Sequence, residues 1–221
     1  MRWFKTKDYP QFWEEYQQAF QNKTSENLDE VRFVVFDTET TGLDTKSDKI
    51  LSIGAVAVKG NSIDISDSFE IYLEQDKFNG DTVEIHGILK SGNLKKHTES
   101  IALQQFLDYT KNAILVAHHA AFDLAMINQG LKNMGLPKLK NKVLDTGFLF
   151  RKTTLAESIK THHSLDVLCD VFKVPKHDRH TASGDAYITA IIMIKIIALL
   201  KKNRQLALSD LFINPNKPGL L

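Results

Sequence analysis

Two carboxylates at the end of an apolar run restrict the possible fold more than any other feature of this sequence. Residues 31–37 are mostly β-branched or aromatic, which predicts a strand that breaks at Gly42. Residues two apart on a strand point to the same face, so Asp37 and Glu39 should lie side by side. Like charges so placed repel, and divalent cations offset that repulsion. The alternative is a turn with two solvated acids, which the surrounding threonines would suit.

Two later segments carry acids in comparable positions. Asp123 follows an apolar strand predicted over 113–117 and falls in the first turn of the next predicted helix. Asp185 stands near the start of a long predicted helix, and His180 precedes it in the loop. A histidine is a suitable general base for water, so His180 is expected to reach over the site that Asp185 faces. Singly, each acid has an ordinary explanation as a helix-start charge. Together and in this order they predict a catalytic constellation.

The ligand chemistry favours Mg²⁺ or Mn²⁺. The four carboxylates carry a charge of about −4, which two divalent ions would neutralise while clamping a phosphodiester. Hard oxygen ligands without thiolates suit these two metals. The sequence has a single cysteine, Cys169, and this excludes an internal disulfide framework and a cysteine-based zinc site. Cys169 lies in an apolar run. This cysteine usage fits a reducing compartment, so the expected location is cytoplasmic.

The other elements predict an α/β fold with a mixed sheet. Strands over 50–58 and 62–73 are joined by a Lys-Gly-Asn hairpin signal, so the sheet begins antiparallel. Alternating helices and strands then add parallel neighbours. Beyond the elements already named, helices are predicted over 98–112, 120–134, 148–158, 164–172 and 181–202, and a strand over 142–145. The apolar stretch 188–200 is too short for a membrane span and predicts a buried central helix.

Three regions are expected along the chain. Residues 1–30 would form an amphipathic helix over 8–21, capped by Asp8, and then a linker. This helix would dock a partner or pack on the domain that follows. Residues 31–204 would form the catalytic domain, and 205–221 a C-terminal tail whose residues 214–219 are expected to be loose.

The charge balance excludes one mode of nucleic-acid binding. Lys plus Arg total 28 and Asp plus Glu total 27, giving a formal net charge of +1. A protein that wraps nucleic acid by bulk positive charge is therefore excluded, whereas binding through local patches is not.

With these motifs in place, the sequence resembles the DEDDh family of 3′→5′ exonucleases, and within it the proofreading epsilon subunit of bacterial DNA polymerase III. The resemblance spans residues 31–200 and rests first on Phe36-Asp-Thr-Glu-Thr-Thr-Gly-Leu43. The second and third motifs are Ala117-His-His-Ala-Ala-Phe-Asp123 and His180-Thr-Ala-Ser-Gly-Asp-Ala186.

The resemblance implies a ribonuclease H-like fold and a set of roles. Asp37, Glu39, Asp123 and Asp185 would hold two metal ions, and His180 would deprotonate the attacking water to release a nucleoside 5′-monophosphate. The substrate-binding residues implied are Thr40, Leu43, His86, His119 and Phe122. His119 departs from the family, which commonly has Asn there. A basic loop before His180, with Lys176, His177 and Arg179, would touch phosphate or remain solvated.

The function expected is hydrolysis of single-stranded DNA from 3′ ends in proofreading or repair. An RNA-trimming exoribonuclease of the same family is the first alternative, because the residues above serve both substrates. A non-catalytic module bound to a polymerase or sliding clamp is the second, and the intact catalytic set argues against it. Residues 205–212 loosely resemble clamp-docking peptides, with core packing as the other explanation. The expected partners are therefore a nucleic-acid 3′ end and a polymerase subunit or clamp, without a membrane.

Overall fold

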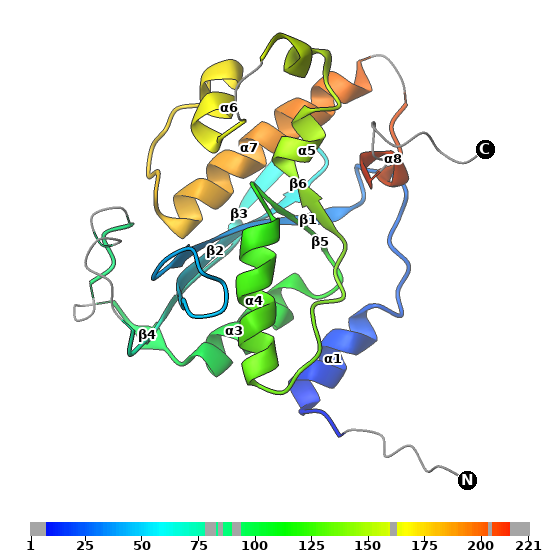
Figure 1. Cartoon of the computed structure of the whole chain (residues 1–221). Helices are drawn as coiled ribbons and strands as arrows, with labels where there is room; N and C mark the ends of the chain where they lie inside the picture. Colours follow the sequence, from blue (N-terminus) through cyan, green and yellow to red (C-terminus); the bar gives the residue numbers. More distant parts are fainter. Residues whose placement is uncertain are drawn as a thin grey trace.

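The computed structural model describes residues 8–77, 83, 86–89, 94–159, 163–202 and 205–212 (Figure 1). Its centre is a six-stranded mixed sheet in the order β4-β3-β2-β1-β5-β6. Neighbours β1–β2 and β2–β3 are antiparallel, whereas β1–β5, β5–β6 and β3–β4 are parallel. The strands are β1 (Arg32–Thr40), β2 (Ile50–Lys59), β3 (Ser62–Leu73), β4 (Lys96–His97), β5 (Ile114–Ala117) and β6 (Val143–Asp145). The predicted α/β fold with a mixed sheet is confirmed.

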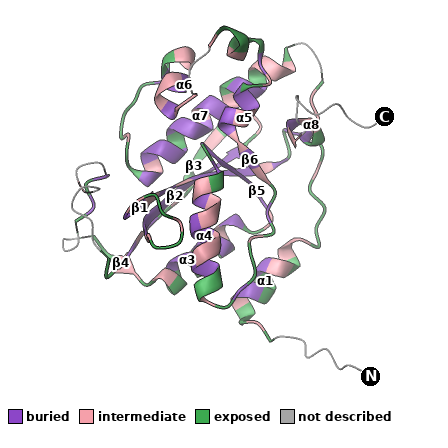
Figure 2. Cartoon of the chain, viewed as in Figure 1, coloured by how far each residue is buried: buried purple, intermediate pink, exposed green. Residues whose placement is uncertain are grey.

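Helices cover both faces of the sheet and bury two apolar layers (Figures 1 and 2). One layer is formed with α1 (Gln11–Ala19), α3 (Glu99–Thr110) and α4 (Ala121–Asn133). The opposite layer is formed with α5 (Thr146–Phe150), α6 (Leu165–Phe172), α7 (Ala182–Lys201) and α8 (Leu208–Phe212). Since both faces are covered, the central strands are apolar on both sides, as their sequences are.

The alternation along β1 decides which layer meets the acids. Val34 and Phe36 pack into the layer of α1, α3 and α4, whereas Phe33 and Val35 pack into the layer of α7. Asp37 continues the second series, and Glu39 follows two residues later. The strand runs on to Thr40 because it stays paired with β2, and it ends just before Gly42, where the sequence predicted the break.

Two predicted helices are wrong in their bounds. The first begins at Gln11, because Pro10 sits extended at the N-cap position, so Asp8 lies outside the helix and does not cap it. The helix predicted over 148–158 is two short pieces. It starts early because the side chain of Asp145 caps α5, and extended backbone at Thr153 separates α5 from a 3₁₀ turn, Thr154–Ser158.

Helix α7 is the apolar helix that the sequence predicted. By length and composition it could cross a membrane, but half of its apolar window is buried within the protein. Its buried residues pack on β1 and β2 in the core layer described above. Membrane insertion is therefore not needed to explain its composition.

The segments that flank the central region pack on it. Trp13 and Tyr16 of α1 are buried, and α1 lies against α3. The Tyr16 hydroxyl donates to Asn141 Oδ1 at 2.6 Å and accepts from the backbone N–H of Lys140 at 2.7 Å. Leu208 and Leu211 of α8 are buried in the core, while residues 214–219 lie outside the described part of the chain.

Removing the Tyr16 hydroxyl should loosen α1. Tyr16→Phe leaves the buried Asn141 side-chain oxygen and the part-buried Lys140 N–H without this partner, so we expect a loss of about 1–3 kcal/mol in unfolding free energy. Urea denaturation followed by circular dichroism measures it. Gln18→Ala, at an exposed position of the same helix, should stay within about 0.5 kcal/mol of wild type. Equal stability of both variants would show that α1 is not held by this contact.

Candidate active site

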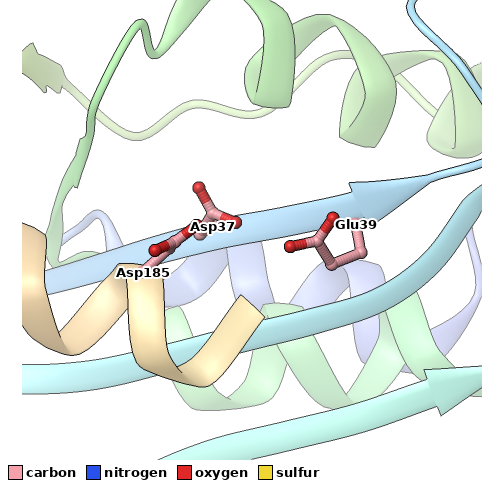
Figure 3. Close-up of side chains that lie close together, drawn as sticks. All are labelled: Asp37, Glu39 and Asp185. Atoms are coloured by element: carbon pink, nitrogen blue, oxygen red, sulfur yellow. The ribbon is translucent and has the colours of Figure 1, made fainter. Parts of the chain in front are cut away.

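Three carboxylates converge where α7 meets the carboxyl end of β1 (Figure 3). One oxygen from each of Asp37, Glu39 and Asp185 lies within 4.8 Å of the others. Asp37 and Glu39 come from the strand and keep part of their surface exposed, whereas Asp185 comes from the first turn of α7 and is buried. The expected side-by-side placement of the strand pair is thus present, and α7 adds a third acid.

The convergence depends on a glycine that the sequence reading did not single out. Gly54 of β2 is paired directly with Asp37 of β1. A Cβ at Gly54 would lie 2.2 Å from the backbone nitrogen of Ser183 and 2.3 Å from the carbonyl carbon of Ala182. The missing side chain therefore lets the first turn of α7 approach the sheet closely enough for Asp185 to reach Asp37.

Asp123 stands beside this cluster and is fixed by β1. Its Oδ1 accepts two hydrogen bonds from Thr38, one from the backbone N–H at 3.0 Å and one from the hydroxyl at 2.6 Å. The residue is buried in the first turn of α4, as the sequence predicted for its position. Thr38 thus positions the Asp123 carboxylate, a role that the motif alone did not reveal.

Crowding of these acids changes their protonation. Burial raises the pKa of Asp37 well above its ordinary value, and the negative charges of Asp123 and Asp185 add to this. Burial, followed by the charge of Asp185, raises the pKa of Glu39 to about 7. Burial also raises the pKa of Asp123 to about 7, against the hydrogen bonds from Thr38. Without added positive charge, the cluster therefore holds protons near neutral pH.

The donor set fits divalent metal. Carboxylate oxygens are hard ligands, and clustered anions with raised pKa values bind a cation in exchange for protons. Asp37, Glu39 and Asp185 are close enough to share one ion. Asp123 is not one of these three, although its charge acts on Asp37, and its Oδ1 is held by Thr38.

Arg179 is the cation already at this cluster. Its guanidinium donates through Nη1 to Asp185 Oδ1, and through Nε and Nη2 to the two oxygens of Asp166 at 3.0 and 3.1 Å. Only 15% of its side chain is exposed. Arg179 is therefore not a solvated loop residue, one of the two alternatives left open by the sequence, and its guanidinium is paired with two carboxylates. Lys176 pairs with Asp170 instead.

Both histidines next to the acids adopt left-handed backbone. His180 has φ +64°, and its N–H donates to Asp185 Oδ2 at 3.3 Å, while its side chain is exposed. His119 has φ +58°, a region in which Asn and His are both enriched. This explains how histidine replaces the family's usual asparagine at 119 without changing the backbone. His119 also packs edge-on against His118, with ring centroids 4.3 Å apart.

The other substrate-binding candidates lie in different settings. Leu43 is 84% exposed, so its side chain is available to a ligand. Thr40 is buried and donates its hydroxyl to the Gly42 carbonyl at 2.7 Å. His86 is buried, accepts from the Ile88 N–H at 3.0 Å, and has a pKa lowered by burial. Phe122 is partly buried against the layer of α3 and α4.

An acidic cluster with the donors for divalent metal, at the edge of a mixed α/β sheet, fits the class of metal-dependent phosphodiester hydrolases. Comparison with known families makes this specific. The exonuclease family model matches residues 34–193, and the chain belongs to that family. This is the family of DEDD exonucleases, whose members use divalent metal.

Sequence relatives include two long bacterial polymerases. The DNA polymerase III PolC-type of Caldanaerobacter subterraneus subsp. tengcongensis is 38% identical over 174 residues, covering 78% of this chain and 12% of that protein. The same-named protein of Oceanobacillus iheyensis is 34% identical over 182 residues, covering 81% and 12%. The chain thus spans about one eighth of the length of these relatives.

Solved structures show the same fold. Exonuclease X in complex with 5′ overhanging duplex DNA matches with a TM-score of 0.58 at 24% identity, covering 76% of this chain and 91% of that one. Escherichia coli Exonuclease I in complex with a dT13 oligonucleotide matches with a TM-score of 0.66 at 15% identity, covering 77% and 42%. At these identities the likeness supports the ribonuclease H-like fold and nothing finer.

Filling the space at Gly54 should separate the acids. In Gly54→Ala the added methyl meets backbone, which cannot rotate away, so the start of α7 must shift. We expect Mn²⁺ affinity to fall at least about tenfold and stability to fall by about 1–3 kcal/mol. Isothermal titration calorimetry and urea denaturation measure these. Gly130→Ala in α4 is the matched control, since its methyl meets the end of the Leu103 side chain of α3 and not backbone. Wild-type Mn²⁺ affinity in Gly54→Ala would contradict this account.

Metal binding should strengthen as pH rises. Because the pKa of Glu39 is raised to about 7, its protonated form stabilises the metal-free protein below about pH 4.5, and that contribution is lost as pH rises through 7. Metal needs the deprotonated form, so the Kd for Mn²⁺ should fall about tenfold or more between pH 6 and 8. Calorimetry at pH 6, 7 and 8 tests this. Glu39→Gln should bind Mn²⁺ more weakly, with a flatter pH profile. A pH-independent wild-type Kd would contradict the argument.

Proposed function

We propose that this protein removes nucleotides one at a time from the 3′ end of single-stranded DNA, using two Mg²⁺ or Mn²⁺ ions and releasing nucleoside 5′-monophosphates. The observation that carries the proposal is the convergence of three acids from β1 and α7, with Asp123 of α4 beside them. These four residues match the acidic positions of the three motifs, one by one.

The chain's own residues supply distinct parts of the reaction. Asp37, Glu39, Asp123 and Asp185 would hold the ions, which when bound supply Lewis-acid activation and charge neutralisation at the phosphate. His180 would accept a proton from the attacking water. The bond formed joins the water oxygen to phosphorus, and the bond broken joins phosphorus to the 3′ oxygen of the preceding nucleotide. The shortened strand leaves with a 3′ hydroxyl.

DNA is favoured over RNA as the substrate by the comparisons. The sequence relatives are DNA polymerases, and two of the matching structures hold DNA. Proofreading beside a polymerase subunit is the role that this points to, and the polymerase would be a partner of this chain. RNA trimming is the competing assignment. The cytoplasm remains the proposed location.

Clamp docking through residues 205–212 receives less support. Leu208 and Leu211, which a clamp-docking peptide would present, are buried in the core next to α7. A clamp could bind this segment only after it left the domain. The polymerase is therefore the better-supported partner, and the core-packing explanation of this segment accounts for its apolar residues.

The reaction is tested with matched 5′-labelled DNA and RNA oligonucleotides. We expect metal-dependent shortening from the 3′ end, with DNA degraded faster. Asp185→Asn should abolish turnover because it removes a ligand charge, and His180→Ala should lower kcat about 10²–10⁴-fold as loss of a general base does. His97→Ala in β4 is the matched histidine control. Full activity of Asp185→Asn would refute the ligand assignment, and faster digestion of RNA would replace DNA with RNA as substrate.

A further inference from the structure

A cavity opens at the same edge of the sheet as the acidic cluster. Its volume is about 500 Å³, and its wall includes His119, Asp145, Phe148, Arg151 and Phe212. Because β1, β5 and β6 are parallel neighbours, their carboxyl ends lie at one edge. Asp145 at the end of β6 is two strands away from β1 and level with Phe36, the residue before Asp37, so at strand spacings of about 4.8 Å it lies roughly 10 Å from that point of β1. The cavity is therefore within reach of a nucleic-acid strand whose 3′ end lies at the acidic cluster.

Aromatic rings and cations alternate around this cavity. The guanidinium of Arg151 lies 5.8 Å, and the ammonium of Lys152 4.9 Å, from the centroid of the Phe148 ring. The ammonium of Lys142 lies 5.5 Å from the centroid of the Phe212 ring. Both phenylalanines are partly exposed, and Arg151 is exposed. Aromatic faces with neighbouring cations are the chemistry that binds single-stranded nucleic acid, through base stacking and phosphate contacts.

Asp145, the acid among the described residues of the cavity wall, accepts hydrogen bonds from two backbone N–H groups. Asp145 Oδ1 accepts from the Phe148 N–H at 2.7 Å, and Oδ2 accepts from the Ala120 N–H at 2.8 Å. The Asp145 carboxylate thus caps the N-terminus of α5 and fixes the segment between β5 and α4. That segment also carries His119, and Asp123 follows within the first turn of α4. The cavity and the acidic cluster are consequently connected through this segment along one edge of the sheet.

The wall contributed by α8 lies outside the range that the exonuclease family model matches. That range is residues 34–193, and Phe212 lies beyond it. The Lys152 ammonium donates to the Asp210 carbonyl at 2.8 Å, which fastens α8 beside the end of α5. Together with the buried leucines of α8, this contact holds Phe212 at the cavity.

We propose that this cavity is a subsite for a nucleotide upstream of the scissile bond. Phe148 and Phe212 offer faces on which its base stacks, and Arg151 contacts its phosphate. The subsite rests on the proposed exonuclease function and extends it, because it lets the enzyme hold a strand and not only its terminal nucleotide. A segment of a partner protein is the competing occupant.

Two substrates of different length test the subsite in the full-length protein. One is a labelled single-stranded oligonucleotide, which reaches the cavity, and the other is the p-nitrophenyl ester of thymidine 5′-monophosphate, which does not. Arg151→Glu should raise KM for the oligonucleotide about tenfold or more, as loss of a charge-assisted contact does, with a change of less than about twofold for the ester. Phe212→Leu, which keeps apolar volume but removes the aromatic face, should raise the oligonucleotide KM about fivefold.

A binding measurement adds a readout that structural damage does not mimic. In an Asp185→Asn background, the slope of log affinity against log salt should become shallower by about 0.7 in Arg151→Glu, or somewhat more because the charge is reversed. Lys59→Glu makes the same charge change at the opposite end of the sheet, where Lys59 is exposed and pairs with Arg32 of β1. It should change neither KM nor the slope.

The outcomes separate the subsite from the catalytic proposal. If the wild-type protein degrades neither substrate, the exonuclease proposal fails, and the subsite with it. If wild type degrades the oligonucleotide but Arg151→Glu behaves like Lys59→Glu, the subsite alone is wrong and a protein partner becomes the better occupant. Equal loss of ester and oligonucleotide hydrolysis in Arg151→Glu would also overturn the subsite.

Discussion

The close approach of α7 to the central strands is the contact on which the site depends. Four acids of three separate elements repel one another, which is why burial and neighbouring charge raise the pKa values of Asp37, Glu39 and Asp123. The apolar face of α7, buried on β1 and β2, stabilises the fold enough to hold them together. The absence of a side chain at Gly54 sets how near that helix comes. The buried apolar interface between α7 and the sheet thus holds together an acidic site whose members would otherwise repel one another.

Arg179 shows how the protein tolerates the charge of this site. A guanidinium that contacts Asp185 and grips Asp166 with two further hydrogen bonds balances part of the negative charge. It also connects α6 to the start of α7 through the loop that carries His180. The left-handed backbone at His180 lies between these two anchors, at Arg179 and Asp185. The position of the proposed general base is therefore tied to that of a proposed metal ligand, through the hydrogen bond from the His180 N–H to Asp185.

Much of the site was predictable because motifs and periodicity report local geometry. The two-residue spacing of Asp37 and Glu39 fixes a shared face on a strand, and Asp123 and Asp185 sit in first turns as their sequences indicate. What the sequence did not reveal are contacts between distant segments. The Thr38–Asp123 hydrogen bonds, the Gly54–Ser183 approach and the Arg179–Asp166 pair join positions with no shared pattern. Asp8 does not cap the helix for a local reason, because the backbone at Pro10 is extended and the helix begins after it.

The segments outside the matched family range contact each other and add to the core. The segment before β1 and the segment after α7 bind each other: Asn27 bridges to Ala207, and the Leu208 N–H donates to the Glu26 carbonyl at 3.0 Å. Lys201 pairs with Asp29 at 2.8 Å in the same place. Since Leu28 and Leu208 are both buried, these segments extend the core of the exonuclease fold. The position of α8, and hence the aromatic wall beside the acids, follows from the N-terminal segment as much as from the catalytic domain.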